Sequence, residues 1–187
     1  PATAEELIRL GADLLDPRGG ELTALGIVEV PEGMPLSEGA TRARHARRLL
    51  QRVLDFVPEG THIHPLVRIG RHAAEGIVEA AAELEADLIV FGWGGKSPSG
   101  RELGMSPFSA TIGEVLRESP CDIAVVKQRG VRDLKRVVVP VRGGPHAELA
   151  LRVASAIAHR HEATLVVLHV VPPGITLAVR AQAERAL

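Results

Sequence analysis

The sequence predicts an α/β protein with an open parallel sheet that helices cover on both faces. Segments with apolar residues at helical spacing alternate with short β-branched runs, which is the pattern of βαβ units. The runs at 87–91 (DLIVF) and 136–141 (RVVVPV) are typical of buried parallel strands. In addition, the order helix then strand recurs when the chain is shifted by 143 positions, which indicates a tandem repeat.

The first region contains four expected helices and four expected strands. Apolar residues at helical spacing, such as Leu7, Leu10 and Leu14, predict the first helix, which the residues Pro-Arg-Gly-Gly at 17–20 end. The run DLIVF is the most apolar strand, and we expect it to be strongly buried and central. The expected helices are 4–15, 40–57, 73–84 and 110–118, and the expected strands are 22–30, 62–67, 87–91 and 122–126.

The repeat aligns Leu14 with Ile157 and Leu22 with Leu165. In the second copy, strand 136–141 precedes the helix 147–159, whereas the equivalent strand of the first copy would lie before Pro1. We therefore expect a first domain at 1–131 without its first strand, and an incomplete second domain of strand, helix and strand at 132–187. The chain then reads as a fragment of a longer protein.

Composition excludes several classes of protein. The formal net charge of −1 gives no reason to propose nucleic acid as a partner. A single cysteine, Cys121, rules out an internal disulfide and fits a reducing compartment. The sequence has neither a signal peptide at its start nor an apolar run of about 20 residues that could span a bilayer. We expect a cytoplasmic location.

A candidate phosphate-binding loop follows the run DLIVF. Ligands of open parallel sheets bind beyond the carboxyl ends of the strands. Glycines there, such as Gly92 and Gly95, let backbone N–H groups approach phosphate oxygens. The next helix begins near Ser109 and Thr111, and a helix N-terminus attracts anions. The spacing alone is neither a P-loop nor a dinucleotide-binding turn.

Three segments carry a resemblance to a known family. ADLIVFGWGG at 86–95, TIGEVLRESP at 111–120 and SPCDIAVVK at 119–127 resemble the universal stress protein family. The resemblance implies an adenine-nucleotide alpha-hydrolase-like fold, often duplicated, with five parallel strands in the order 3-2-1-4-5. It also implies ATP, AMP or another adenine nucleotide as ligand. The Gly-Trp-x-Gly variant is similar to stress-protein domains fused to amino-acid permeases or cation/proton antiporters.

The sequence departs from the family pattern at the closing Gly-Ser of the phosphate signature. Ser109 and Ala110 stand there, after a loop of thirteen residues at 96–108 instead of about nine. In the second copy, Arg142 replaces the aspartate that holds adenine in the family. The candidate nucleotide site comprises Val28, Gly92, Trp93, Gly94, Gly95, Ser109, Ala110 and Thr111 in the first copy, and Val141, Arg142 and Gly143 in the second.

In the order 3-2-1-4-5, the first strand lies at the centre of the sheet. We expect residues 136–141, within the chain or by swapping, or residues before Pro1, to fill that position, because two unpaired interior edges would bury unsatisfied backbone groups.

The resemblance implies a non-catalytic regulatory module of stress response, the cytosolic domain of a membrane transporter at the inner membrane, which senses adenine nucleotide. Expected partners are a second copy, the tandem repeat or the membrane-embedded part. One alternative is a nucleotide-using enzyme such as an ATPase, and another is a purely structural dimerisation or interaction domain with a decayed site.

His62 and His64 form a possible metal pair but are read as an exposed pair on an edge strand. The Arg-rich face of helix 40–57 is either solvated or faces an acidic partner or the transporter body.

Overall fold

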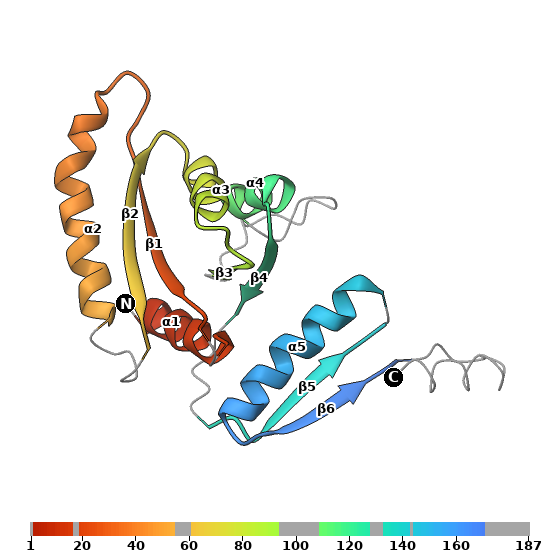
Figure 1. The fold of residues 1–187 in the computed structure, drawn as a ribbon. Coiled ribbons are helices and arrows are strands. Elements are labelled where there is room, and N and C mark those ends of the chain that lie inside the picture. The colour runs from red at the N-terminus through yellow and green to blue at the C-terminus, as the bar shows by residue number, and fades with distance from the viewer. Residues whose placement is uncertain are drawn as a thin grey trace. The chain divides into compact units, whose positions relative to one another are not determined.

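The computed structural model describes residues 2–16, 19–54, 61–93, 109–127, 133–142 and 144–170. The chain divides into two compact units, Pro1–Arg129 and Gly130–Leu187, which are called unit 1 and unit 2. Figure 1 shows the helices and strands of both units. In unit 1 they are α1 (Ala2–Leu14), β1 (Leu22–Glu29), the 3-10 helix η1 (Leu36–Glu38), α2 (Gly39–Leu54), β2 (Ile63–Gly70), α3 (Ala73–Glu83), β3 (Leu88–Gly92), α4 (Ala110–Glu118) and β4 (Asp122–Val126).

Unit 1 has parallel strands with helices on both faces, as the sequence predicts. The neighbours Gly26 and Ile27 in β1 show this arrangement, because successive residues of a strand face opposite sides. An ideal Cβ on Gly26 would lie 3.6 Å from a methyl group of Leu50 in α2, and one on Gly76 in α3 would lie 3.1 Å from Ile27. Thus α2 covers one face of β1 and α3 covers the other.

The strands of unit 1 form two parallel pairs, β1 with β2 and β3 with β4. In the order 3-2-1-4-5, β1, β2, β3 and β4 correspond to strands 2, 3, 4 and 5. The two observed pairs are therefore the outer pairs that this order requires. The expected continuous sheet of five strands is wrong for the described residues, because their first element is the helix α1 and no described strand of unit 1 lies between β1 and β3.

The expectation that DLIVF is central and strongly buried is also wrong for the described residues. Each residue of β3 is only partly buried, because β4 is its sole described partner. The largest fully buried side chains of the described part of unit 1 lie elsewhere, at Val30 and Val115, which are 2% and 0% exposed.

Unit 2 consists of β5 (Arg136–Pro140), α5 (Pro145–Arg160) and β6 (Thr164–Leu168), with β5 and β6 paired in parallel. Its core consists of Val139, Val141 and Ala154, and Leu151 and Leu165 pack against them. The division between the units at residues 129 and 130 lies close to the expected boundary after residue 131. The interpretation of unit 2 as the start of a second domain stays a prediction. The filling of the central position by residues 136–141 within the chain is wrong for the described residues, because β5 pairs there with β6 alone, whereas filling by swapping stays a prediction.

Candidate functional site

The carboxyl ends of β3 and β4 meet in register and position an aromatic ring and a cation. Gly92 pairs with Val126, and the next residue, Trp93, donates its backbone N–H to the Val126 carbonyl at 2.8 Å. The Nζ of Lys127 lies 4.3 Å from the centroid of the Trp93 ring, which is a cation–π contact. Trp93 is expected at this edge from the sequence, whereas Lys127 is not, although its position directly after an apolar strand was a signal for it.

The N-terminus of α4 carries the hydroxyl groups that the sequence marks as candidate anion ligands. Ser109 is the N-cap residue, and its Oγ accepts a hydrogen bond from the backbone N–H of Ile112 at 3.3 Å. The Ser109 carbonyl accepts from the N–H of Gly113 at 2.9 Å. The Ser109 O–H remains able to donate to an anion while its oxygen caps the helix, and the N–H groups of Ala110 and Thr111 are further donors of this turn suited to an anion.

Gly94 and Gly95, together with the loop at 96–108, lie outside the described residues. Among the described residues, the candidate groups for a phosphate are therefore of two kinds: the β3 end with Trp93 and Lys127, and the first turn of α4, a helix that packs against α3. A positive charge at a strand end and a helix N-terminus are both suited to a phosphate group. These groups are therefore candidate ligands for an anion.

Val28 is buried, with 8% of its surface exposed, and pairs in register with Ile69 of β2. Its side chain therefore belongs to the core of unit 1, and any contribution to a ligand would come from its backbone or from a neighbour. In unit 2, Val141 is buried as well, and its backbone N–H donates to the Leu168 carbonyl at 2.8 Å. Arg142 follows it and is exposed, whereas Gly143 lies outside the described residues.

The loop after β1 is tied to the start of α3 by contacts that sequence reasoning missed. The Glu29 carboxylate accepts a hydrogen bond from the backbone N–H of Ala73 at 2.8 Å. Arg71 donates through Nη1 to the carbonyl oxygens of Val30 and Pro31, at 3.2 and 2.6 Å. These partners lie some 40 residues apart in the chain, so no local pattern could reveal them. Because a carboxylate occupies the N-terminus of α3, an anionic ligand is not expected there.

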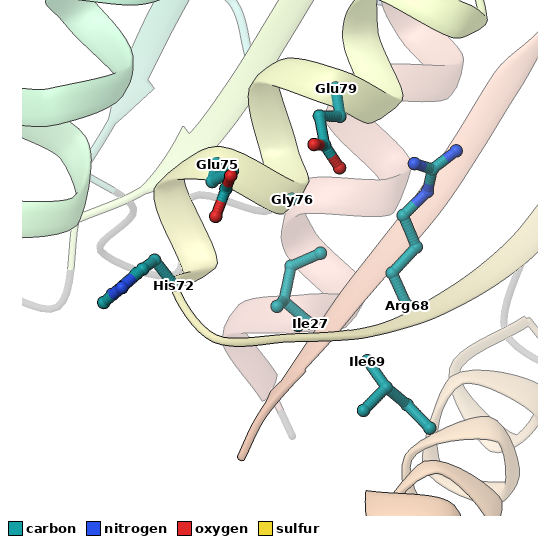
Figure 2. Close-up of a pocket in the computed structure, with 8 residues that line it drawn as sticks. Ile27, Arg68, Ile69, His72, Glu75, Gly76 and Glu79 are labelled. Atoms are coloured by element: carbon teal, nitrogen blue, oxygen red, sulfur yellow. The ribbon is translucent and has the colours of Figure 1, made fainter. Parts of the chain in front are cut away.

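A cavity of about 340 Å³ lies between β2 and α3. Figure 2 shows Arg68 from β2 and the carboxylates of Glu75 and Glu79 from α3 around it. The Arg68 guanidinium forms a bidentate ion pair with Glu83, with Nη1 and Oε1 3.0 Å apart. The hydrogen bond from Arg68 lowers the pKa of Glu83, and the same bond raises the pKa of Arg68. With one arginine already paired and two further carboxylates, this cavity does not suit a phosphate group.

The described residues contain no cluster of three His, Cys, Asp or Glu side chains that could hold a metal ion. His62 and His64 are exposed, and β2 is an edge strand among the described strands. None of the described helices is long and apolar enough to cross a membrane.

The fold defines a class: a parallel α/β domain with helices on both faces of its strands. Residues 1–127 and 133–186 match the model of the universal stress protein family, and the chain belongs to that family.

Two solved structures share this fold. The universal stress protein UspA from Lactobacillus plantarum is 21% identical, with a TM-score of 0.50 over 67% of this chain and 88% of that chain. A universal stress protein from Pseudomonas aeruginosa UCBPP-PA14 is 16% identical, with a TM-score of 0.54 over 88% of this chain and 66% of that chain. A further universal stress protein, in complex with cAMP, has a TM-score of 0.45 and 20% identity over 68% of this chain and 89% of that chain.

A membrane protein is also related to this chain. The Na(+)/H(+) antiporter NhaS5 of Synechocystis sp. is 28% identical over 177 residues, which cover 92% of this chain. The chain spans about a quarter of the antiporter, since the match covers 25% of its length.

Proposed function

We propose that the chain is a non-catalytic regulatory module, the cytosolic part of a membrane transporter, which senses an adenine nucleotide at the carboxyl edge of β3 and β4. The observation that carries the transporter assignment is the match to the antiporter, which extends over 92% of this chain and a quarter of that protein. A domain of this length is therefore related to part of a much longer membrane protein. Its expected location is the cytosolic face of the inner membrane.

The proposed module is a tandem one. Two separate segments match the family, and α5 followed by β6 repeats the order of α1 followed by β1. A shift of 143 positions moves α1 onto residues 145–157, which lie within α5. The two copies are expected to pair within the chain or with a second copy.

Two groups support binding of nucleotide phosphates. The Lys127 ammonium is held over Trp93 at the strand end, and the first turn of α4 offers backbone N–H groups at Ala110 and Thr111. The indole of Trp93 can stack on a base if Lys127 moves to a phosphate. Neither contact requires the Gly-Ser pair that Ser109 and Ala110 replace.

One observation favours a second function, that of an interaction domain with a decayed nucleotide site. Ala110 offers no hydroxyl where the family pattern has the serine of Gly-Ser. This change weakens the phosphate site by one hydrogen-bond donor.

Isothermal titration calorimetry with ATP, AMP and cyclic dinucleotides tests the sensor. We expect ATP to bind, Thr111→Val to weaken binding, and Ala110→Ser to strengthen it by about fivefold to tenfold, since one added hydrogen bond contributes roughly 1–1.5 kcal/mol. Ala40→Ser, the same exchange in the first turn of α2, is the matched control and should change nothing. Absence of heat with every nucleotide at millimolar concentration would leave the interaction domain, and steady release of phosphate from ATP would make the chain an enzyme.

A further inference from the structure

The helix α2 presents a surface of a single charge sign. Its 16 residues include five arginines and no acidic residue. All five arginine side chains are exposed, whereas Ala43 is only 1% exposed. The arginines are Arg42, Arg44, Arg47, Arg48 and Arg52. These five side chains are called the arginine face.

Packing fixes the direction in which this face points. An ideal Cβ on Gly39 would lie 2.6 Å from a methyl group of Ile69 and 2.8 Å from one of Val30, so the helix sits tightly on the strands. Arg44, Arg48 and Arg52 are spaced four residues apart and form one row along the helix. This row lies on the side away from Ala43, because the helical period places residues 43 and 48 on opposite sides.

The arginine face is unfavourable for an isolated α2. Like charges four residues apart repel each other, and Arg42 and Arg44 lie in the first turns, where the helix dipole already carries positive charge. Among the described residues, the only contact given for these arginines is a hydrogen bond from Arg44 to the Thr41 hydroxyl at 3.1 Å. An external anionic surface would relieve both effects.

We propose that the arginine face docks unit 1 on an anionic membrane surface, where guanidinium groups bind lipid phosphates. Clusters of four to eight basic residues bind acidic lipids in this way, and the planar guanidinium suits phosphate. Exposed apolar side chains accompany the face: Leu49 on α2 is 47% exposed, and Leu36 and Met34 just before the helix are 48% and 45% exposed. Such residues can enter the boundary between headgroups and acyl chains.

Other polyanions fit less well. The helix has no aromatic side chain on which a base could stack, and the whole chain has a formal net charge of −1. Binding to lipid does not depend on whether nucleotide binds. The docking proposal rests on the proposed transporter function in one respect: that function favours a membrane, rather than an acidic protein, as the partner of the arginine face.

Co-sedimentation of the 187-residue chain with vesicles tests the proposal. We expect binding to vesicles of phosphatidylserine and phosphatidylcholine, none to phosphatidylcholine alone, and release at high salt, where charges are screened. The triple variant Arg44→Gln, Arg48→Gln, Arg52→Gln should bind roughly 100-fold more weakly, at about fivefold for each arginine. The matched control is Arg117→Gln, Arg136→Gln, Arg152→Gln, three exposed arginines on other elements, which should bind like the unmodified chain.

Equal weakening in both triple variants would overturn the proposal, because it would show only a dependence on total charge. Absence of vesicle binding would overturn it as well. If size exclusion then showed a salt-sensitive dimer that only the α2 variant loses, the arginine face would be an interface between copies.

Circular dichroism of each variant verifies that α2 remains folded, and a single exchange, Arg48→Gln, gives the same comparison with less perturbation. Nucleotide calorimetry is unaffected by these outcomes, so failure of one proposal does not imply failure of the other.

Discussion

The carboxylate of Glu29, the last residue of β1, accepts a hydrogen bond from the backbone N–H of Ala73 in the first turn of α3, at 2.8 Å. The N-cap residue of this helix, His72, makes no side-chain cap of its own. Glu29 of β1 thus caps the N-terminus of α3 in place of His72. Its negative charge also interacts favourably with the positive end of the helix dipole.

Removal of this cap should destabilise unit 1. We expect Glu29→Ala to lower the free energy of unfolding by about 1 kcal/mol, the usual effect of losing a helix cap. Urea denaturation followed by circular dichroism measures it. Glu32→Ala, an exposed glutamate in the following turn, is the control and should change stability by less than half as much. Equal losses in the two variants would contradict the role of Glu29.

The Arg68–Glu83 pair predicts a dependence of stability on pH. The folded pKa of Glu83 is lowered by its hydrogen bond from Arg68, so its contribution is present above the usual glutamate pKa, about 4.3, and is lost as pH falls through the lower folded value. The difference in stability between the unmodified chain and Glu83→Gln should therefore be present at neutral pH and vanish in acid. Thermal unfolding across this range measures it, with the exposed Glu114→Gln as control. A difference that persists in acid would contradict the ion pair.

Two helical glycines should respond in opposite ways to alanine. A Cβ on Gly39 would lie within 3 Å of methyl groups of Ile69 and Val30, so Gly39→Ala should cost about 1–3 kcal/mol through overpacking. Among the described residues, no atom outside the α4 backbone lies within 4 Å of the corresponding position at Gly113, so Gly113→Ala should stabilise by about 0.4–1 kcal/mol. Urea titrations of both variants decide this, and a gain in stability at Gly39 would show that the contact with β2 relaxes freely.

The contact between Lys127 and Trp93 should be visible in fluorescence, because Trp93 is the only tryptophan of the chain. We expect Lys127→Gln to alter the emission and to lower stability by about 0.5–1 kcal/mol, the range of an exposed cation–π contact. Lys127→Arg should preserve both properties, since a guanidinium also lies well over an indole. Lys135→Gln in unit 2 is the control, and an emission spectrum unchanged in Lys127→Gln would refute the contact in solution.

The sequence predicted the elements closely where local patterns decide them. The helix at 110–118 and the strand at 122–126 were confirmed at both ends, because Ser109 caps the helix and Ser119 and Pro120 separate the two elements. The helix expected at 73–84 ends one residue earlier, and the strand expected at 62–67 extends to Gly70. The end of β2 is set by its pairing with β1, which the alternation of apolar residues in the sequence does not show.

The site was less predictable, because its contacts join distant residues. Glu29 and Arg71 look like ordinary exposed charges in the sequence, and only the fold brings them to the α3 start. Ser109 was expected to offer its hydroxyl to an anion, which stays a prediction; its role as the cap of α4, where its oxygen accepts from Ile112, was not predicted. Burial of the run DLIVF was overestimated, since the apolar character of a strand does not reveal how many neighbours it acquires.

The separate pairing of the strands in unit 1 has a consequence for solvent exchange. No described backbone hydrogen bond of the β1–β2 ladder depends on the β3–β4 ladder, so opening one pair does not break the other. Within the described part of unit 1, packing couples the two pairs, because α1 contacts both β1 and β3, and α3 contacts both β1 and α4. Deuterium is therefore expected to enter the two ladders at different rates, as two local opening units within one compact body.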